Sequence, residues 1–161
     1  MEPGKRNPVT QEGAEPELKR PVVVLAFVSI GLVYSTMLVG VFLSSGPITE
    51  NGIVCTEWPL CPNGFGPPED HYLMEYVHRV IAAITAAVVY ATAVIVPSRA
   101  RRAKKVALIA AWLVSLQIVL GLLTVLTTLT PLVVASHLST GISLFAFGLL
   151  TFLWAGIWKK R

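Results

Sequence analysis

Charged residues are scarce in this chain. They make up 14% of its 161 residues, whereas hydrophobic residue types make up 54%. Soluble globular domains carry about 25% charged residues, so the composition excludes that class and indicates a protein of the lipid bilayer. Lys and Arg number 13 against 9 Asp and Glu, a net charge of +4. Because so apolar a chain leaves no surface for reading nucleic acid, we expect no nucleic-acid partner.

Cysteine and histidine are also rare, and this limits the chemistry that the chain can perform. Its two Cys residues allow one disulfide, and its three His residues allow one small metal or haem site. Any chemical function must therefore rest on a few residues.

Long apolar runs occupy most of the chain. A membrane-spanning helix needs about 20 mainly apolar residues. The segment 106–158 has no charge and is too long for one crossing, so we expect a corner at TTLTP, residues 127–131. The predicted fold class is an all-α integral membrane protein, a bundle of four transmembrane helices. The predicted spans are about 22–44, 72–96, 106–126 and 132–157.

The basic residues predict the orientation. Four lie in residues 1–20, five in 97–105 and three in 159–161, which leaves Arg79 as the exception. We expect residues 97–105 to form a tight basic turn between two spans. The positive-inside rule then places both termini in the cytoplasm of a cell-membrane protein and the loop 45–71 outside. Residues 1–20 are polar and Pro-containing, so we expect a disordered tail, with the first span as an uncleaved anchor. Residues 159–161 are expected to form a basic cytoplasmic end.

Both cysteines, Cys55 and Cys61, fall in this outer loop, where we expect them to form a disulfide because cytosolic reductants are absent. Two roles remain open for the pair. It can be a staple that stiffens the loop over the bundle, or a redox-active pair that passes electrons. Five residues separate the two cysteines, a looser spacing than the Cys-x-x-Cys of thiol oxidoreductases.

Two histidines lie within spans. His78 and His137 each lie about six residues inside a helix, counted from the outer face, so they share a depth. Ionisable groups within a membrane are costly and commonly functional. Two imidazoles at one depth suit the axial ligation of a haem iron better than a zinc site, which needs more ligands. The alternative is that each His only forms a hydrogen bond between helices. His71, in the loop, is expected to be solvated.

Glu75 and Arg79 lie beside His78 on the second span. Glu75 precedes His78 by three residues, so the two side chains share a helix face. Glu75 can therefore accept a proton or hold water at the haem, or it can be an anchor at the start of the helix. Arg79 suits a haem propionate because a guanidinium pairs well with a carboxylate. Asp70 and Glu75 are competing partners for it.

A weak repeat relates two helical hairpins. LVYSTMLVG at 32–40 aligns with LVSLQIVLG at 113–121, and each segment precedes a helix that carries a His. If the repeat is real, each hairpin provides one axial ligand. Gly40 and Gly121 then allow a porphyrin or a neighbouring helix to approach closely, as small residues do in ordinary helix packing.

The motifs together resemble the N-terminal half of haem A synthases, over about residues 22–158. The order and depth of the WPLC and Glu-x-x-His-Arg elements make the resemblance rather specific. The elements that carry it are CTEWPLC at 55–61, EYVHR at 75–79, QIVLGLLTV at 117–125, and His137.

The resemblance implies oxidation of the C8 methyl group of haem O to the formyl group of haem A, for cytochrome oxidase assembly. It implies catalytic roles for Glu75, Cys55 and Cys61, with His78 and His137 as the ligands of a haem, either haem b or haem O/A. Family members commonly have eight spans in two halves, whereas this chain has four. A homodimer would restore eight, and haem O synthase is an expected partner.

Two other classes fit some of the same residues. A small b-type cytochrome would use the His pair for electron transfer, without a need for Glu75 or the Cys loop. A DsbB-like membrane thiol oxidoreductase also has four helices and outer cysteines, but it requires a Cys-x-x-Cys motif and a second Cys pair. A protein that only carries haem for assembly is a weaker third alternative.

Overall fold

The computed structural model describes residues 18–45, 55, 57–59, 61, 64, 66 and 68–157. The expectations for residues 1–17, for most of the loop 45–71 and for residues 159–161 lie outside these described residues. No strand occurs among the described residues.

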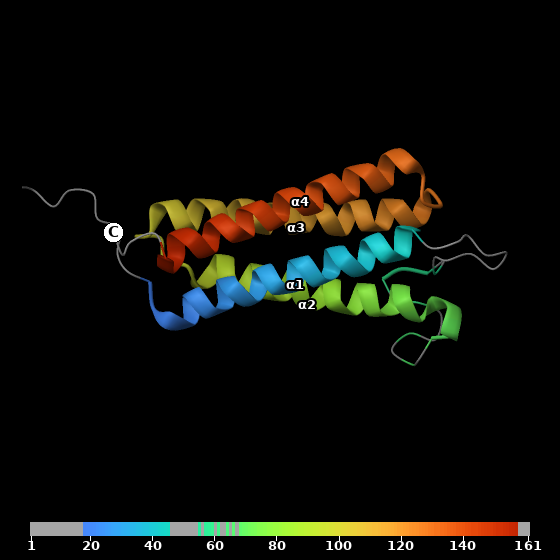
Figure 1. Cartoon of the computed structure of the whole chain (residues 1–161), viewed down its shortest axis with the longest axis horizontal. Coiled ribbons are helices and arrows are strands. Elements are labelled where there is room, and N and C mark those ends of the chain that lie inside the picture. Colours follow the sequence, from blue (N-terminus) through green and yellow to red (C-terminus); the bar gives the residue numbers. More distant parts are fainter. Residues whose placement is uncertain are drawn as a thin grey trace, which may run out of the picture.

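Four long helices make up the described structure (Figure 1). Each is long and apolar enough to cross a membrane, so the prediction of an all-α bundle with four spans is confirmed, and the chain is a multi-pass membrane protein. A short 3₁₀ helix, η1, precedes the second helix, and a π-helix, η2, continues the fourth. The elements are α1 Arg20–Ser45, η1 Asp70–Tyr72, α2 Leu73–Ile95, α3 Arg101–Leu126, α4 Pro131–Phe152 and η2 Leu153–Ile157.

The connection between α2 and α3 is shorter than the expected basic turn at 97–105. Pro97 follows the end of α2, as is common after a helix, and α3 begins at Arg101, inside the basic segment. Lys and Arg are good helix formers, and their long side chains can reach beyond the apolar layer. Lys104 also caps α2, because its Nζ donates to the carbonyl oxygen of Ala93 at 2.7 Å.

The helices pack in ring order. α1 packs against α2 and α4, and α3 packs against α4 and α2, so α2 and α4 stand at opposite corners of the bundle. We call the end with the α1–α2 connection and the 127–130 turn the loop end, at the right of Figure 1, and the opposite end the terminal end. The turn at the loop end is tight, with Thr128 and Leu129 at positive φ and Pro131 starting α4.

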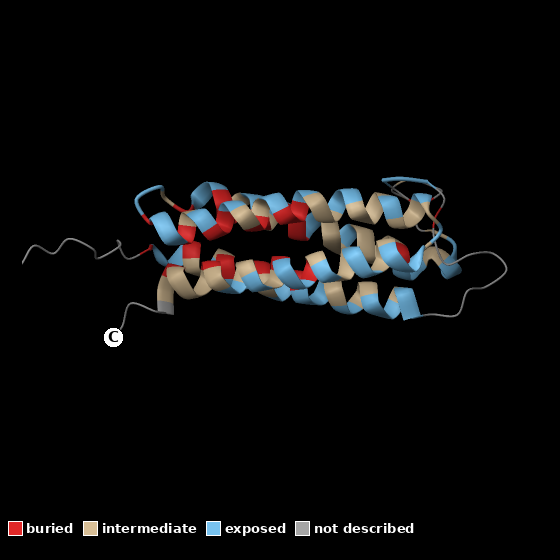
Figure 2. Ribbon diagram, turned by 90° about the horizontal axis from the view of Figure 1, so that it is seen from above, coloured by how far each residue is buried: buried red, intermediate tan, exposed pale blue. Residues whose placement is uncertain are grey.

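The core is uneven along the bundle. Figure 2 shows buried residues concentrated toward the terminal end. Many of them are small, and small residues allow helices to approach closely in membranes. Toward the loop end, a cavity lies between the helices. The cluster nearest the terminal end consists of Leu18, Val22, Ala93, Val96, Ala100, Ala103, Ala107 and Ala155.

Hydroxyl pairs fix the register of α1 against α2. Ser29 and Thr92 are hydrogen-bonded at 3.0 Å, and Thr36 and Thr85 at 2.9 Å. The members of these pairs are seven residues apart on each helix, so they lie two turns apart along one seam. The next position along the α2 side of the seam, seven residues toward the loop end, is His78. The register thus places His78 against the loop-end half of α1.

Candidate functional site

A cavity of about 720 Å³ lies between the helices in the loop-end half of the bundle. Residues of all four helices line it, and Trp58 and Pro59 of the loop complete the wall. Its volume falls within the range of about 300–1,000 Å³ that is typical of ligand pockets, which are mostly apolar with a few polar groups. The cavity is therefore a candidate binding site.

His78 and His137 both line this cavity. Since α2 and α4 stand at opposite corners, the two imidazoles enter the cavity from opposite sides of the bundle. The Nδ1 atom of each ring is buried and has no hydrogen-bond partner among the described residues. Buried polar atoms without a partner are uncommon and require an explanation. An apolar cavity with two opposed imidazoles fits a haem with two axial His ligands.

A glycine lies against each of the two histidines. A Cβ at Gly40 would lie 3.0 Å from Cε1 of His78, and a Cβ at Gly121 would lie 3.6 Å from Cε1 of His137. These glycines occupy equivalent positions in the sequence repeat. The two hairpins therefore use the same arrangement, in which a glycine makes room for the imidazole of the next helix.

Gln117 also contacts the second histidine, and no role was predicted for it. Its Nε2 donates to the backbone carbonyl oxygen of His137 at 2.8 Å. The residue type indicates such a contact, because an amide side chain inside a mainly apolar span needs a hydrogen-bond partner on a neighbouring helix. This bond ties α3 to α4 at the level of the cavity.

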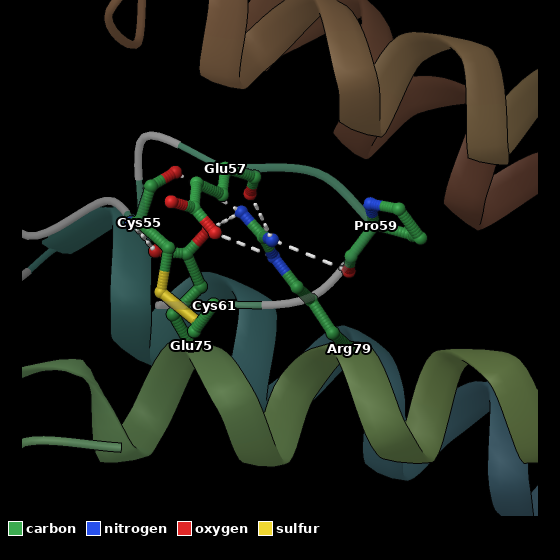
Figure 3. The surroundings of a disulfide bond; sticks show 6 residues. All are labelled: Cys55, Glu57, Pro59, Cys61, Glu75 and Arg79. Carbon is green, nitrogen blue, oxygen red and sulfur yellow. Dashed lines mark hydrogen bonds and ion pairs between the residues drawn. A yellow bond between two sulfur atoms is a disulfide. The ribbon is translucent and has the colours of Figure 1, made fainter. Parts of the chain in front are cut away.

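The loop is anchored to α2 beside the cavity (Figure 3). A disulfide joins Cys55 and Cys61, whose Cα atoms are 5.2 Å apart, and both residues are fully buried. The backbone N–H of Cys55 donates to Oε2 of Glu75. A buried carboxylate from α2 thus holds the loop at its disulfide.

Arg79 uses every donor of its guanidinium, which has five N–H groups. Nε and Nη2 donate to Oε1 of Glu75 at 3.0 and 2.5 Å. The remaining bonds go to backbone carbonyl oxygens, from Nη1 to Glu57 at 2.6 Å and Pro59 at 3.3 Å, and from Nη2 to Cys55 at 3.2 Å. Of the partners left open by the sequence, the structure shows Glu75. The pairing of Arg79 with a haem propionate stays a prediction.

Glu75 and His71 differ in their relation to the cavity. Glu75 is 3% exposed and lines the cavity together with Arg79. Three hydrogen bonds reach its carboxylate, which can accept about four, so one acceptor position remains. His71 is exposed, lies 3.5 Å from a carboxylate oxygen of Glu69, and does not line the cavity.

No group of three or more His, Cys, Asp or Glu that could hold a bare metal ion occurs among the described residues.

The fold and this site define a class: a four-helix membrane protein with an apolar cavity that is lined by a His from each of two opposed helices. The family model for the cytochrome oxidase assembly protein, COX15-CtaA, matches residues 68–161, more than half of the chain. The chain belongs to this family, the haem A synthase family. The match covers α2, α3 and α4, with Glu75, Arg79 and both cavity histidines, but neither cysteine.

A curated relative is the protoheme IX farnesyltransferase of Haloarcula marismortui. It is 32% identical over 133 residues, which are 81% of this chain and 28% of the relative. The chain therefore spans less than a third of that protein's length. No solved structure matches the chain.

Proposed function

We propose that this protein is a haem A synthase, which oxidises the C8 methyl group of haem O to a formyl group for cytochrome oxidase assembly. The observation that carries the proposal is the pair His78 and His137 in one apolar cavity, within a chain of the cytochrome oxidase assembly family. The name of the relative, a farnesyltransferase acting on protohaem IX, supports a farnesylated haem as substrate and the enzyme that makes it as a partner.

His78 and His137 would hold the haem through its iron, and a haem held there would supply redox chemistry. The apolar walls of the cavity would exclude water from the reacting methyl group. Glu75 is proposed as the proton acceptor, because it lines the cavity and keeps one free acceptor position on its carboxylate. Arg79 would hold this carboxylate in place from the adjacent turn of α2.

For the cysteine pair we propose a structural role. Both residues are buried, and Glu75 and Arg79 bind the backbone around Cys55. The disulfide would therefore hold Trp58 and Pro59 against the cavity.

We also propose a homodimer that brings eight helices together and an orientation with the loop end outside the cytoplasm. The distribution of Lys and Arg supports this orientation.

The test is pigment analysis of the purified protein from a host that makes haem O but no haem A. We expect haem A in the extract when the unchanged protein is present. The variants His78→Ala and His137→Ala should yield no haem A, whereas His71→Ala, which alters a histidine outside the cavity, should yield the normal amount. An extract with haem B alone would contradict the synthase and indicate a b-type cytochrome.

A further inference from the structure

Part of the cavity wall also forms the lipid-facing surface of the bundle. Val80 and Ile84 of α2 and Ile118 of α3 line the cavity, yet they are 39%, 50% and 41% exposed. The cavity-lining residues of α4, in contrast, are buried or half-buried, with Gly141 and Leu144 fully inside. The cavity therefore opens sideways between α2 and α3. We call this opening, flanked by Val80, Ile84 and Ile118, the α2–α3 window.

The window has clear limits along the bundle. Toward the terminal end, a hydrogen bond of 2.7 Å between Tyr90 and Ser115 joins α2 to α3. Toward the loop end, the window ends at Arg79, which lines the cavity and is hydrogen-bonded to the loop. The window thus lies within two membrane-spanning helices and presents apolar side chains, while the charged pair of the cavity, Glu75 and Arg79, lies at the loop end.

The repeat relates α2 and α3 to α4 and α1, and the residues at the matching positions of α4 and α1 do not form an exposed cavity wall. Counted from the two cavity histidines, the positions on α4 that match Val80 and Ile84 are Ser139 and Ser143. Both serines are exposed, and neither lines the cavity. On α1, the repeat position that matches Ile118 is Met37, which is half-buried. The two halves of the repeat therefore differ at these positions. Exposed apolar residues line the cavity between α2 and α3, but not at the matching positions of α4 and α1.

An isoprenoid chain is the part of a farnesylated haem that fits such an opening. It is long, uncharged and as apolar as lipid, so it can lie between apolar helix faces and the bilayer without burying a polar group. The propionates of the same molecule need polar surroundings, which the window does not offer. The named reaction of the curated relative attaches a farnesyl group to protohaem IX.

We infer that the α2–α3 window is the subsite for the isoprenoid tail of the substrate haem, and that the tail passes through it into the bilayer. This inference rests on the proposed function. It adds the structural feature by which the site would distinguish haem O, which carries the tail, from haem B. A bulky side chain in the window then weakens binding of the farnesylated haem and spares protohaem IX.

The experiment uses the full chain in lipid nanodiscs, titrated separately with haem O and haem B and followed by the low-spin absorption spectrum. The variants are Ile84→Trp and Ile118→Trp, which fill the window. The matched controls are Val94→Trp and Val119→Trp, on the same helices, 77% and 52% exposed and outside the cavity lining. Haem B binding reports on the folding of every variant.

We expect the window variants to raise the Kd for haem O roughly tenfold, about 1.4 kcal/mol, and to change the Kd for haem B less than about twofold. The control variants should bind both haems as the unchanged protein does. Equal weakening of both haems, or unchanged binding of haem O, overturns the tail subsite while the proposed function stands. If the unchanged protein gives a low-spin spectrum with neither haem, the proposed function itself fails.

Discussion

The backbone of Gly40 lies directly against the imidazole of His78, so that a Cβ at position 40 would lie 3.0 Å from the ring atom Cε1. Contacts of this length are tighter than ordinary van der Waals packing. The ring and α1 therefore share a space that only glycine leaves open, and any larger residue must rotate or displace the imidazole.

The first prediction follows from this contact. Gly40→Ala should weaken haem binding and shift the low-spin signal in electron paramagnetic resonance, because overpacking costs about 1–3 kcal/mol. Gly121→Ala should have a smaller effect, since its Cβ would lie 3.6 Å from His137. Gly31→Ala is the control, as a Cβ there meets nothing within 4 Å. Equal effects of the Gly40 and Gly31 variants would show that the glycine does not position the ring.

Glu75 provides the second prediction. Glu75→Gln keeps the shape of the side chain and an acceptor for Arg79, but removes the group that can take a proton. We expect the variant to fold, to bind haem with an unchanged spectrum, and to make little haem A while haem O accumulates. Pigment extraction measures this. Haem A at the normal rate would leave Glu75 as an anchor of the loop only.

The third prediction concerns the five hydrogen bonds of Arg79. Lysine keeps the charge but has three donors on one nitrogen, so Arg79→Lys should release backbone carbonyls of the loop. We expect the Cys55–Cys61 disulfide to be reduced roughly tenfold faster by a water-soluble thiol, about 1.4 kcal/mol of lost protection. The control is Arg99→Lys, at an exposed site between α2 and α3. Equal reduction rates in the two variants would contradict the anchoring role.

The fourth prediction is that Cys55 and Cys61 are joined in the protein isolated from its membrane. Because the bond closes a short ring, we expect its loss to lower the free energy of unfolding by only about 2 kcal/mol. Intact mass after alkylation measures the bond: no alkyl groups should add before reduction, and two should add after it. Two additions without reduction would show free thiols.

The sequence predicted the four helices and the cavity histidines because both depend on local signals. Charge-free runs indicate spans, and a His inside a span is rare enough to mark a site. The repeat also singled out Gly40 and Gly121 as places of close approach, but not their contacts with the two histidines. The sequence named Glu75 as a candidate partner of Arg79, and the structure shows this pair. The other partners of Arg79 were not predictable, because they are carbonyl oxygens on a loop about 20 residues away along the chain. The α2–α3 window depends on how two helices diverge, and no single residue type signals that.

The start of α3 shows a similar limit. The basic segment 97–105 was expected to be a turn, but only residues up to Ala100 precede the helix. Hydropathy marks where the apolar layer ends and not where a helix ends, since Lys and Arg can continue a helix into the polar region. Helix bounds and membrane bounds therefore differ at this end of the bundle.

The most direct test of the account is the ligation of haem by His78 and His137. The purified protein, loaded with haem B or haem O, should show a low-spin spectrum with two nitrogen ligands. Substitution of either residue by Ala should convert it to high-spin or abolish binding, while His71→Ala should leave it unchanged. An unaltered low-spin spectrum in both His78→Ala and His137→Ala would contradict the site on which the proposed function rests.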